Sequence, residues 1–217
     1  MVSATLIAAG AGRLTAQSDA AAPVDRAAAA WANVKTVRGT FEQTVTNPLV
    51  GASATTHGSY AEERPNRLSI RFAAPAADAI VADGRFVWIY LPSSAPGQVL
   101  KRPATERGDV PIDLTGRFLD APRAKYTIRP AGTRSEDGHA SHAFTLVPKA
   151  GVDAPFTTAT IWIDDDDSLI RDFEETETSG VVRRVHLTAV EPNAGVDRSA
   201  FVFTPPAGVR VVDQTKP

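Results

Sequence analysis

The sequence predicts a mostly β protein with a few helices, in which one large antiparallel sheet curls toward a barrel. From residue 37 onward, Val, Ile, Thr and Phe alternate with polar residues over many short segments, which is the period of a strand. Turn signals such as Asp83-Gly84 and Ser179-Gly180 separate these segments, and such short connections favour hairpins over crossovers. The chain has 217 residues, of which 43% are hydrophobic, so it can bury a substantial core within one domain.

Charge and cysteine content exclude several classes of protein. The formal net charge is -2, so the basic surface typical of nucleic-acid-binding proteins is missing. There is no cysteine, which excludes disulfides, thiolate metal sites, cysteine nucleophiles and lipid attachment to a thiol. The body of the chain contains no apolar run of about 18 residues, so we expect no membrane-spanning helix.

The first residues look different from the rest of the chain. Residues 4–12 form a short apolar run, and an Ala-rich stretch follows as far as Pro23. This composition is typical of the end of a secretory signal peptide, although the usual positively charged start is missing. We interpret residues 1–22 as a signal peptide or a disordered leader, and residues 23–217 as the folded domain.

Helices are expected in two places. Asp25 is a suitable N-cap for an Ala-rich helix over residues 26–34, whose inner face would carry Trp31 and Val34. The long stretch 103–122 has room for one or two further helical turns. Strands are expected over roughly residues 37–46, 54–63, 67–73, 78–82, 85–91, 97–102, 124–130, 141–148, 156–164, 168–178, 181–191 and 208–212.

Two apolar stripes suggest what the sheet could bind. Leu68, Ile70 and Phe72 alternate with polar residues, so one face of that strand should be apolar and the other wet. Trp88 and Tyr90 belong to a second stripe. A place in the core is the simpler interpretation of any one of these residues. However, so few helices cannot cover the concave face of so large a sheet, and an apolar cleft there would suit a hydrophobic ligand.

No group of residues in the sequence matches a known catalytic or metal-binding pattern. His139 and His142 lie at a hairpin turn and lack the glutamate of a zinc protease motif. The acidic run 164–167 lacks the glycine that a calcium loop needs at its sixth position, where Leu169 stands.

Paired carboxylates have an equally simple explanation. Glu175 and Glu177 share one strand face, and cross-strand ion pairs with Arg183 and Arg184 account for them. We therefore expect neither an enzyme nor a bound metal or cofactor.

Three segments carry a more specific signal. Residues 37–44 read VRGTFEQT, and residues 64–66 read RPN, followed by DGRFVWIY at 83–90. Residues 201–209 read FVFTPPAGV, with DQ at 213–214. In this order and spacing they resemble the LolA family, the periplasmic carriers of outer-membrane lipoproteins.

The resemblance implies an unclosed antiparallel β-barrel in which helices form a lid over a hydrophobic cavity. It also implies the partners of the family. An inner-membrane ABC-type release complex would supply lipoproteins destined for the outer membrane. An outer-membrane receptor, or the outer membrane itself, would accept their acyl chains. Such a shuttle is expected to be a monomer in the periplasm. The alternative is a carrier or sensor of another lipid or glycolipid of the cell envelope, built on the same cradle.

The resemblance also implies site residues. Arg64, in the R-P-N turn, would act as a latch that donates hydrogen bonds to lid carbonyls and keeps the empty carrier closed. Otherwise it is a surface arginine beside Glu62 and Glu63. For the acyl cavity we nominate Leu68, Ile70, Phe72, Trp88, Tyr90, Ile112, Leu114, Trp31 and Phe41.

Overall fold

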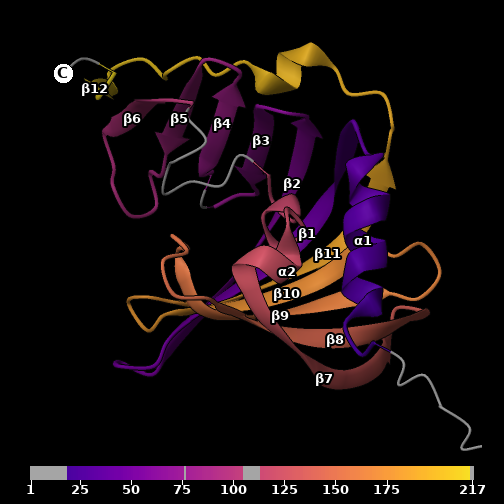
Figure 1. Cartoon of the computed structure of the whole chain (residues 1–217). Coiled ribbons are helices and arrows are strands. Elements are labelled where there is room, and N and C mark those ends of the chain that lie inside the picture. The colour runs from indigo at the N-terminus through magenta and orange to yellow at the C-terminus, as the bar shows by residue number, and fades with distance from the viewer. Residues whose placement is uncertain (1–18, 76, 105–112, 216–217) are drawn as a thin grey trace, which may run out of the picture.

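The computed structural model describes residues 19–75, 77–104 and 113–215, and most of them belong to one sheet of twelve strands (Figure 1). The strand order is β12-β6-β5-β4-β3-β2-β1-β11-β10-β9-β8-β7. Neighbouring strands are antiparallel except β12 and β6. The two edge strands of this order, β12 and β7, do not pair with each other in the described part of the chain, so the barrel is unclosed as predicted.

All the expected strands are present, along with two helices and two 3-10 turns. Their bounds are α1 (Ala22–Ala32), β1 (Thr36–Asn47), β2 (Ala52–Glu63), β3 (Arg67–Phe72), β4 (Ala79–Asp83), β5 (Phe86–Tyr90), β6 (Gln98–Pro103), η1 (Gly116–Phe118), α2 (Pro122–Lys125), β7 (Tyr126–Glu136), β8 (His139–Pro148), β9 (Phe156–Asp164), β10 (Ile170–Glu177), β11 (Val182–Pro192), η2 (Arg198–Phe201) and β12 (Arg210–Asp213). None of the described helices has the length and hydropathy needed to cross a bilayer.

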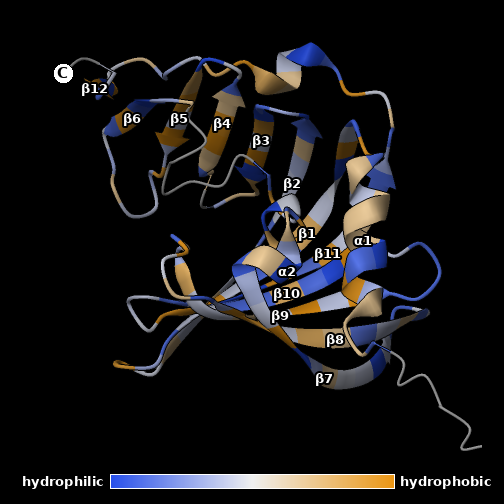
Figure 2. Ribbon diagram, viewed as in Figure 1, coloured by the Kyte–Doolittle hydropathy of each residue, from blue (hydrophilic) through white to orange (hydrophobic). Residues whose placement is uncertain are grey.

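The sheet bends so that its two halves face one another across a concave side. Figure 1 shows β3–β6 meeting β7–β10 at an angle, with β1, β2 and β11 between them. Apolar and polar residues alternate along many of these strands (Figure 2), which gives the sheet one face for the core and one for solvent. The short helix α1 lies on the concave side, with Val24, Ala27 and Trp31 buried.

The start of α1 differs from our expectation. The helix begins at Ala22, because Pro23 suits its first turn, and Asp25 is therefore not the N-cap. The Asp25 carboxylate instead accepts hydrogen bonds of 2.9 Å from Nε of Arg123 in α2. This contact joins the two helices on the concave side.

Strand β7 also differs, since it was expected to end near residue 130 and continues to Glu136. The β7–β8 register shifts between Pro130 and Gly132, where a bulge absorbs the proline at the edge of the sheet. The helical turns expected in residues 103–122 are η1 and the start of α2; residues 105–112 lie outside the described part.

The C-terminal segment covers the outer face of β3–β5. Arg71 donates hydrogen bonds to the carbonyl oxygens of Ala200 and Val202, at 3.4 and 3.2 Å. Ser69, on the same face as Arg71, is buried, so the prediction of a wet face for β3 is wrong at this position. This cover comes from a segment about 130 residues away in the sequence, which strand periodicity cannot reveal.

Aromatic rings fill the other half of the concave side. Phe118, from η1, lies 5.7 Å from the ring of Phe156 and 5.2 Å from that of Phe173, measured between centroids. Phe118 is fully buried, so it anchors the segment that precedes α2 to β9 and β10. That segment, residues 113–118, forms part of the cover over the concave face.

We expect Gly58→Ala to destabilise the fold. A Cβ at Gly58 would lie 2.6 Å from the ring of Phe41 and 2.5 Å from the carbonyl oxygen of Arg71. Phe41 in turn makes an edge-to-face contact with Phe72, with centroids 5.3 Å apart. Moving these groups should lower the free energy of unfolding by about 1–3 kcal/mol, measured by urea denaturation.

The matched control for this change is Gly195→Ala. A Cβ there meets no atom within 4 Å, so the free energy of unfolding should change by less than about 0.5 kcal/mol. Equal urea midpoints for the two variants would contradict the tight packing of Phe41 against β2.

Candidate ligand-binding cavity

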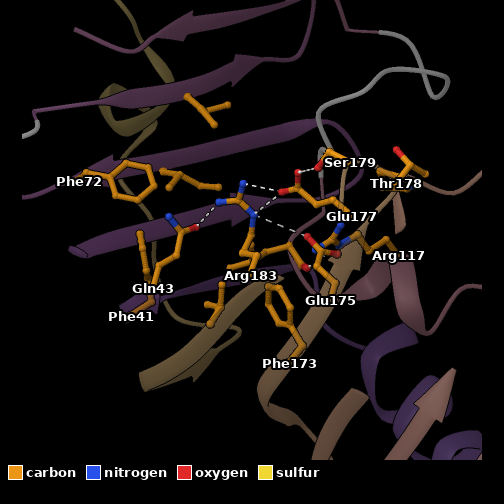
Figure 3. A pocket seen from close by; sticks show the side chains of 15 residues that line it. Phe41, Gln43, Phe72, Arg117, Phe173, Glu175, Glu177, Thr178, Ser179 and Arg183 are labelled. Atoms are coloured by element: carbon orange, nitrogen blue, oxygen red, sulfur yellow. Dashed lines mark hydrogen bonds and ion pairs between the residues drawn. The ribbon is translucent and has the colours of Figure 1, made fainter. Parts of the chain in front are cut away.

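A cavity of about 330 Å³ opens between the two halves of the sheet on the concave side (Figure 3). Five strands contribute to its wall, together with the cover segment and two loops. The lining residues are Phe41, Gln43, Ile70, Phe72, Ile80, Leu114, Arg117, Pro155, Phe173, Glu175, Glu177, Thr178, Ser179, Arg183 and Val185.

One part of this wall is apolar because strand alternation places its residues on one face. Phe41 lies opposite Gly58 on β2, and Gly58 lies opposite Phe72 on β3, so both rings point to the concave side. Ile70 and Ile80 face each other across β3 and β4 on the same side. This surface is suited to hydrocarbon, which needs apolar contact and no hydrogen bonds.

The other part of the wall is ionic. Arg183 donates hydrogen bonds to Gln43 at 2.9 Å and to Glu177 at 2.8 Å. Its Nε lies 3.8 Å from Glu175, whose other carboxylate oxygen lies 3.0 Å from Nη2 of Arg117. Figure 3 shows these side chains converging on Arg183. The cross-strand pairing expected for Glu175 and Arg183 is confirmed, since the two residues are directly opposite. What the sequence did not reveal is that this pair faces the cavity.

Arg64 lies in the turn between β2 and β3, beside the end of α1. Its Nη1 donates to the carbonyl oxygens of Trp31 at 2.7 Å and Val34 at 3.2 Å. Its Nε lies 3.6 Å from the carboxylate of Asp113, and its guanidinium lies 5.5 Å from the centroid of the Trp31 ring. Asp113 accepts further hydrogen bonds from the Trp31 indole at 3.0 Å and from the Gly116 amide at 2.6 Å. Arg64 therefore joins the end of α1 to the start of segment 113–118.

Glu62 reinforces the same junction from the neighbouring strand. It is almost completely buried, and Oε1 accepts a hydrogen bond of 2.8 Å from the Leu114 amide. Burial first, and the nearby Asp113 carboxylate second, raise the pKa of Glu62 well above its usual range. From the sequence, Glu62 is expected only as a neighbour of Arg64. Its alternation with Tyr60 was the available signal that it points inward.

The nominated cavity residues fall into four groups, the last of which is Trp88 and Tyr90. Phe41, Ile70, Phe72 and Leu114 line the cavity. Leu68 and Trp31 are buried in the adjoining core without lining it. Ile112 lies outside the described residues.

Trp88 and Tyr90 need a correction, since they lie on the opposite face of the sheet. Trp88 is opposite Val81, and Val81 is opposite Ser69, so Trp88 shares the outer face with Ser69. The ring of Phe203, in the C-terminal segment, lies 5.8 Å from the rings of both Trp88 and Tyr90. Both alternating sets of residues in β5 are apolar. The sequence pattern therefore cannot show which set points inward. Val87 and Ile89 occupy the inner face instead.

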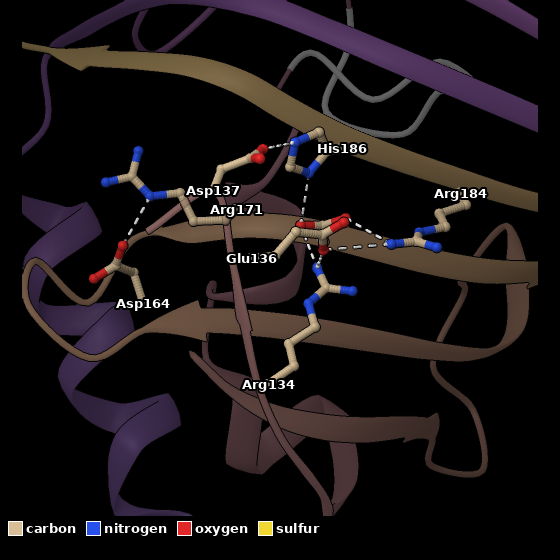
Figure 4. Close-up of polar contacts among 8 residues, drawn as sticks. Arg134, Glu136, Asp137, Asp164, Arg171, Arg184 and His186 are labelled. Atoms are coloured by element: carbon tan, nitrogen blue, oxygen red, sulfur yellow. Dashed lines mark hydrogen bonds and ion pairs between the residues drawn. The ribbon is translucent and has the colours of Figure 1, made fainter. Parts of the chain in front are cut away.

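A second polar cluster lies on the outer face of β10 and β11 (Figure 4). Ligand atoms of Glu136, Asp172 and His186 lie within 4.8 Å of one another, a spacing that could hold a metal ion. However, Arg134 and Arg184 form ion pairs with both carboxylates. These two guanidinium groups already neutralise the carboxylates, which favours a network of ion pairs.

Comparison with known proteins gives a consistent result. Residues 32–204 match the family model described as outer membrane lipoprotein carrier protein LolA. A protein of Proteus mirabilis (strain HI4320), named outer-membrane lipoprotein carrier protein, is 29% identical over 183 residues that cover 83% of each chain. A protein of the same name from Salmonella newport (strain SL254) is 30% identical over 185 residues, 84% of each chain.

Solved structures share the fold at lower identity. An uncharacterized conserved protein from Thermus thermophilus superposes with a TM-score of 0.52 and 11% identity, over 89% of this chain and 96% of that one. A chain of the Pseudomonas aeruginosa MucA/MucB complex gives a TM-score of 0.51 and 16% identity, over 89% of this chain and 63% of that one. These similarities concern the fold alone.

The burial of Glu62 leads to a pH prediction. The folded protein keeps the Glu62 proton at pH values where the unfolded chain, with a pKa near 4.5, releases it. The contribution of this proton to the free energy of unfolding is therefore complete below about pH 4.5. It is lost as the pH rises through the raised pKa of Glu62 in the folded protein. Glu62→Gln mimics the protonated form, so its stability relative to the wild type should increase with pH. Urea denaturation at about pH 5 and about pH 8 measures this difference.

Glu63→Gln is the control, because the neighbouring Glu63 points to the other face and pairs with Arg67. A stability difference between Glu62→Gln and the wild type that does not change with pH would contradict a proton held by Glu62.

Proposed function

The chain belongs to the LolA family of outer-membrane lipoprotein carrier proteins, and we propose that its concave cavity holds the acyl chains of lipoproteins during transfer. The observation that supports this proposal is an apolar wall in an open sheet, lying beside a cover segment that side-chain contacts hold in place. In this proposal Phe41, Ile70, Phe72 and Leu114 contact the hydrocarbon. Leu68 and Trp31 support the wall from the core behind it.

The energetics set the demands on such a carrier. A buried methylene is worth about 0.8 kcal/mol, so one acyl chain of roughly sixteen carbons gains on the order of 10 kcal/mol on leaving water. A lipoprotein therefore needs a carrier to cross an aqueous compartment. The same carrier must give up its cargo, so part of that gain has to be offset within the protein itself.

In our proposal Arg64 supplies this offset. Contacts of Arg64 with Trp31, Val34 and Asp113 stabilise the closed, empty form. A ligand that enters must separate the cover from the sheet and so loses these contacts. The contacts return when the ligand leaves, which favours release. A ligand shifts such an equilibrium only by its differential interaction with the two forms.

We place this cycle in the periplasm. Residues 1–22 would be a signal peptide for export or a disordered leader. An inner-membrane ABC-type complex would load the carrier with lipoproteins. An outer-membrane receptor, or the outer membrane itself, would accept them. The carrier would act as a monomer. The family and the chemistry of the cargo support this choice of partners.

A release assay tests the proposal. Protein comprising residues 19–217 is added to spheroplasts, and the medium is assayed for a soluble complex with newly made lipoprotein. A stoichiometric complex supports the carrier function. Bound free lipid without lipoprotein, identified by native mass spectrometry, would favour a carrier of another lipid instead.

In the same assay we expect Phe72→Glu to abolish the complex. A carboxylate in the apolar wall would have to be desolvated against hydrocarbon, which costs several kcal/mol. Tyr90→Glu is the matched control, because Tyr90 lies on the outer face and should retain the complex. Circular dichroism checks that both variants fold. Equal loss of complex by the two folded variants would contradict the assignment of the inner face as the binding face.

We expect Arg64→Leu to bind lipoprotein but to release it slowly. The variant lacks the contacts that favour the closed, empty form, so ligand exit no longer regains them. Transfer to acceptor membranes should slow by roughly tenfold, the effect of losing about 1.5 kcal/mol from one charge-assisted hydrogen bond. Arg67→Leu is the control, because Arg67 pairs with Glu63 on the other face. Wild-type transfer rates in Arg64→Leu would show that Arg64 is not a latch.

A further inference from the structure

The ionic part of the cavity is unexpected in a site for hydrocarbon. Arg117, Glu175, Glu177 and Arg183 all line the cavity, and we call these four residues the ionic wall. The Glu175 side chain is 7% exposed and that of Arg117 is 15% exposed, so both charges are largely removed from water. Apolar residues of similar volume are often at least as stable as a buried ion pair. The stability of the fold therefore does not explain the ionic wall, which suggests that it has a role in binding.

Two features of the ionic wall indicate what it could bind. It contains two guanidinium groups and two carboxylates, so its net charge is zero. In addition, Oε2 of Glu175 is buried and accepts no hydrogen bond from the described residues, although Arg117 lies 3.0 Å away. The two guanidinium groups that line the cavity carry five N–H donors each. Such a surface, with donors and one free acceptor, suits uncharged ester and amide groups, whereas the phosphate of a phospholipid would lie beside two carboxylates.

We propose that the ionic wall is the subsite for the ester and amide groups that join acyl chains to a lipoprotein, and that Glu175 and Glu177 exclude lipids with anionic head groups. This inference rests on the proposed function and names the part of the cargo that is recognised. Lipoproteins and phospholipids carry similar acyl chains, so the apolar wall cannot distinguish them. Discrimination has to come from the polar junction next to the chains, and like charges provide the repulsive element.

The position of the wall fits this role. Phe173 and Glu175 are two residues apart on β10 and face the same side, so the hydrocarbon and polar contacts adjoin. Gln43, which accepts a hydrogen bond from Arg183, lies two residues after Phe41 on β1 in the same way. An amphipathic ligand can therefore contact the apolar rings with its chains and the ionic wall with its carbonyls.

Glu175→Gln tests the inference, because it keeps the shape of the side chain and leaves the wall with a net charge of +1. The probes are dioctanoyl phosphatidylglycerol and a synthetic dioctanoyl-glyceryl-cysteine peptide without net charge, with affinities measured by calorimetry. The wild type should prefer the lipopeptide. In Glu175→Gln the affinity for phosphatidylglycerol should rise by about tenfold, while that for the lipopeptide should change by less than about threefold.

Two further variants make the test specific. Glu174→Gln is the matched control, since Glu174 is the next residue on β10 and points to the outer face; it should change neither affinity. Glu177→Gln removes the second carboxylate and should act in the same direction as Glu175→Gln. It provides the measurement if Glu175→Gln does not fold.

The outcomes separate this inference from the proposed function. A wild type that binds both probes equally, or folded Glu175→Gln and Glu177→Gln variants with wild-type affinity for phosphatidylglycerol, overturns the inference alone. A wild type that binds neither probe overturns the proposed function and the inference with it.

Discussion

The contacts of Arg64 hold the concave side of this protein together. The last carbonyl groups of an α-helix have no hydrogen-bond partner within the helix. Here the guanidinium of Arg64, in the turn between β2 and β3, donates a hydrogen bond to the carbonyl oxygen of Trp31. The same group lies against Asp113, which itself binds the Trp31 indole and the Gly116 amide. One side chain thus links α1, the sheet and the cover segment. Together with the buried ring of Phe118, this link fixes the cover segment on the open sheet.

In the proposed carrier cycle, the contacts of this junction would give the closed form a limited stability. Hydrogen bonds from a charged donor are stronger than neutral ones, yet each contributes only about 1.5–3 kcal/mol in net terms. Glu62 adds an Oε1 contact to Leu114 but is buried at a cost, as its raised pKa indicates. A junction of this strength is smaller than the gain from burying an acyl chain, so hydrocarbon can displace it. In the same proposal, its strength would also bias the empty protein toward the closed form.

Strand periodicity was sufficient to predict the twelve strands and the apolar identity of the wall, but not every face. In β3 the polar residues at alternate positions identify Leu68, Ile70 and Phe72 as the inner set. In β5 both sets are apolar, and only pairing with β4 and the contact of Phe203 decide that Trp88 and Tyr90 face outward. The ionic wall was missed for a related reason. A charged residue on a strand is usually assigned to the wet face, and Glu175 is the exception because it meets Arg117 from a segment distant in sequence.

Segment 113–118 connects the latch with the binding surface. Asp113 contacts Arg64 and Leu114 contacts Glu62, while Leu114 and Arg117 also line the cavity. Phe118 anchors the far end of the segment among the rings of β9 and β10. A ligand that competes for Arg117 or displaces Leu114 therefore acts on the same short segment that Arg64 holds. Because Phe118 is buried among these rings, we propose that the segment opens at its Asp113 end, where the contact with Arg64 lies. In the proposed function, occupation of the cavity and loss of the Arg64 contacts would be coupled through these six residues.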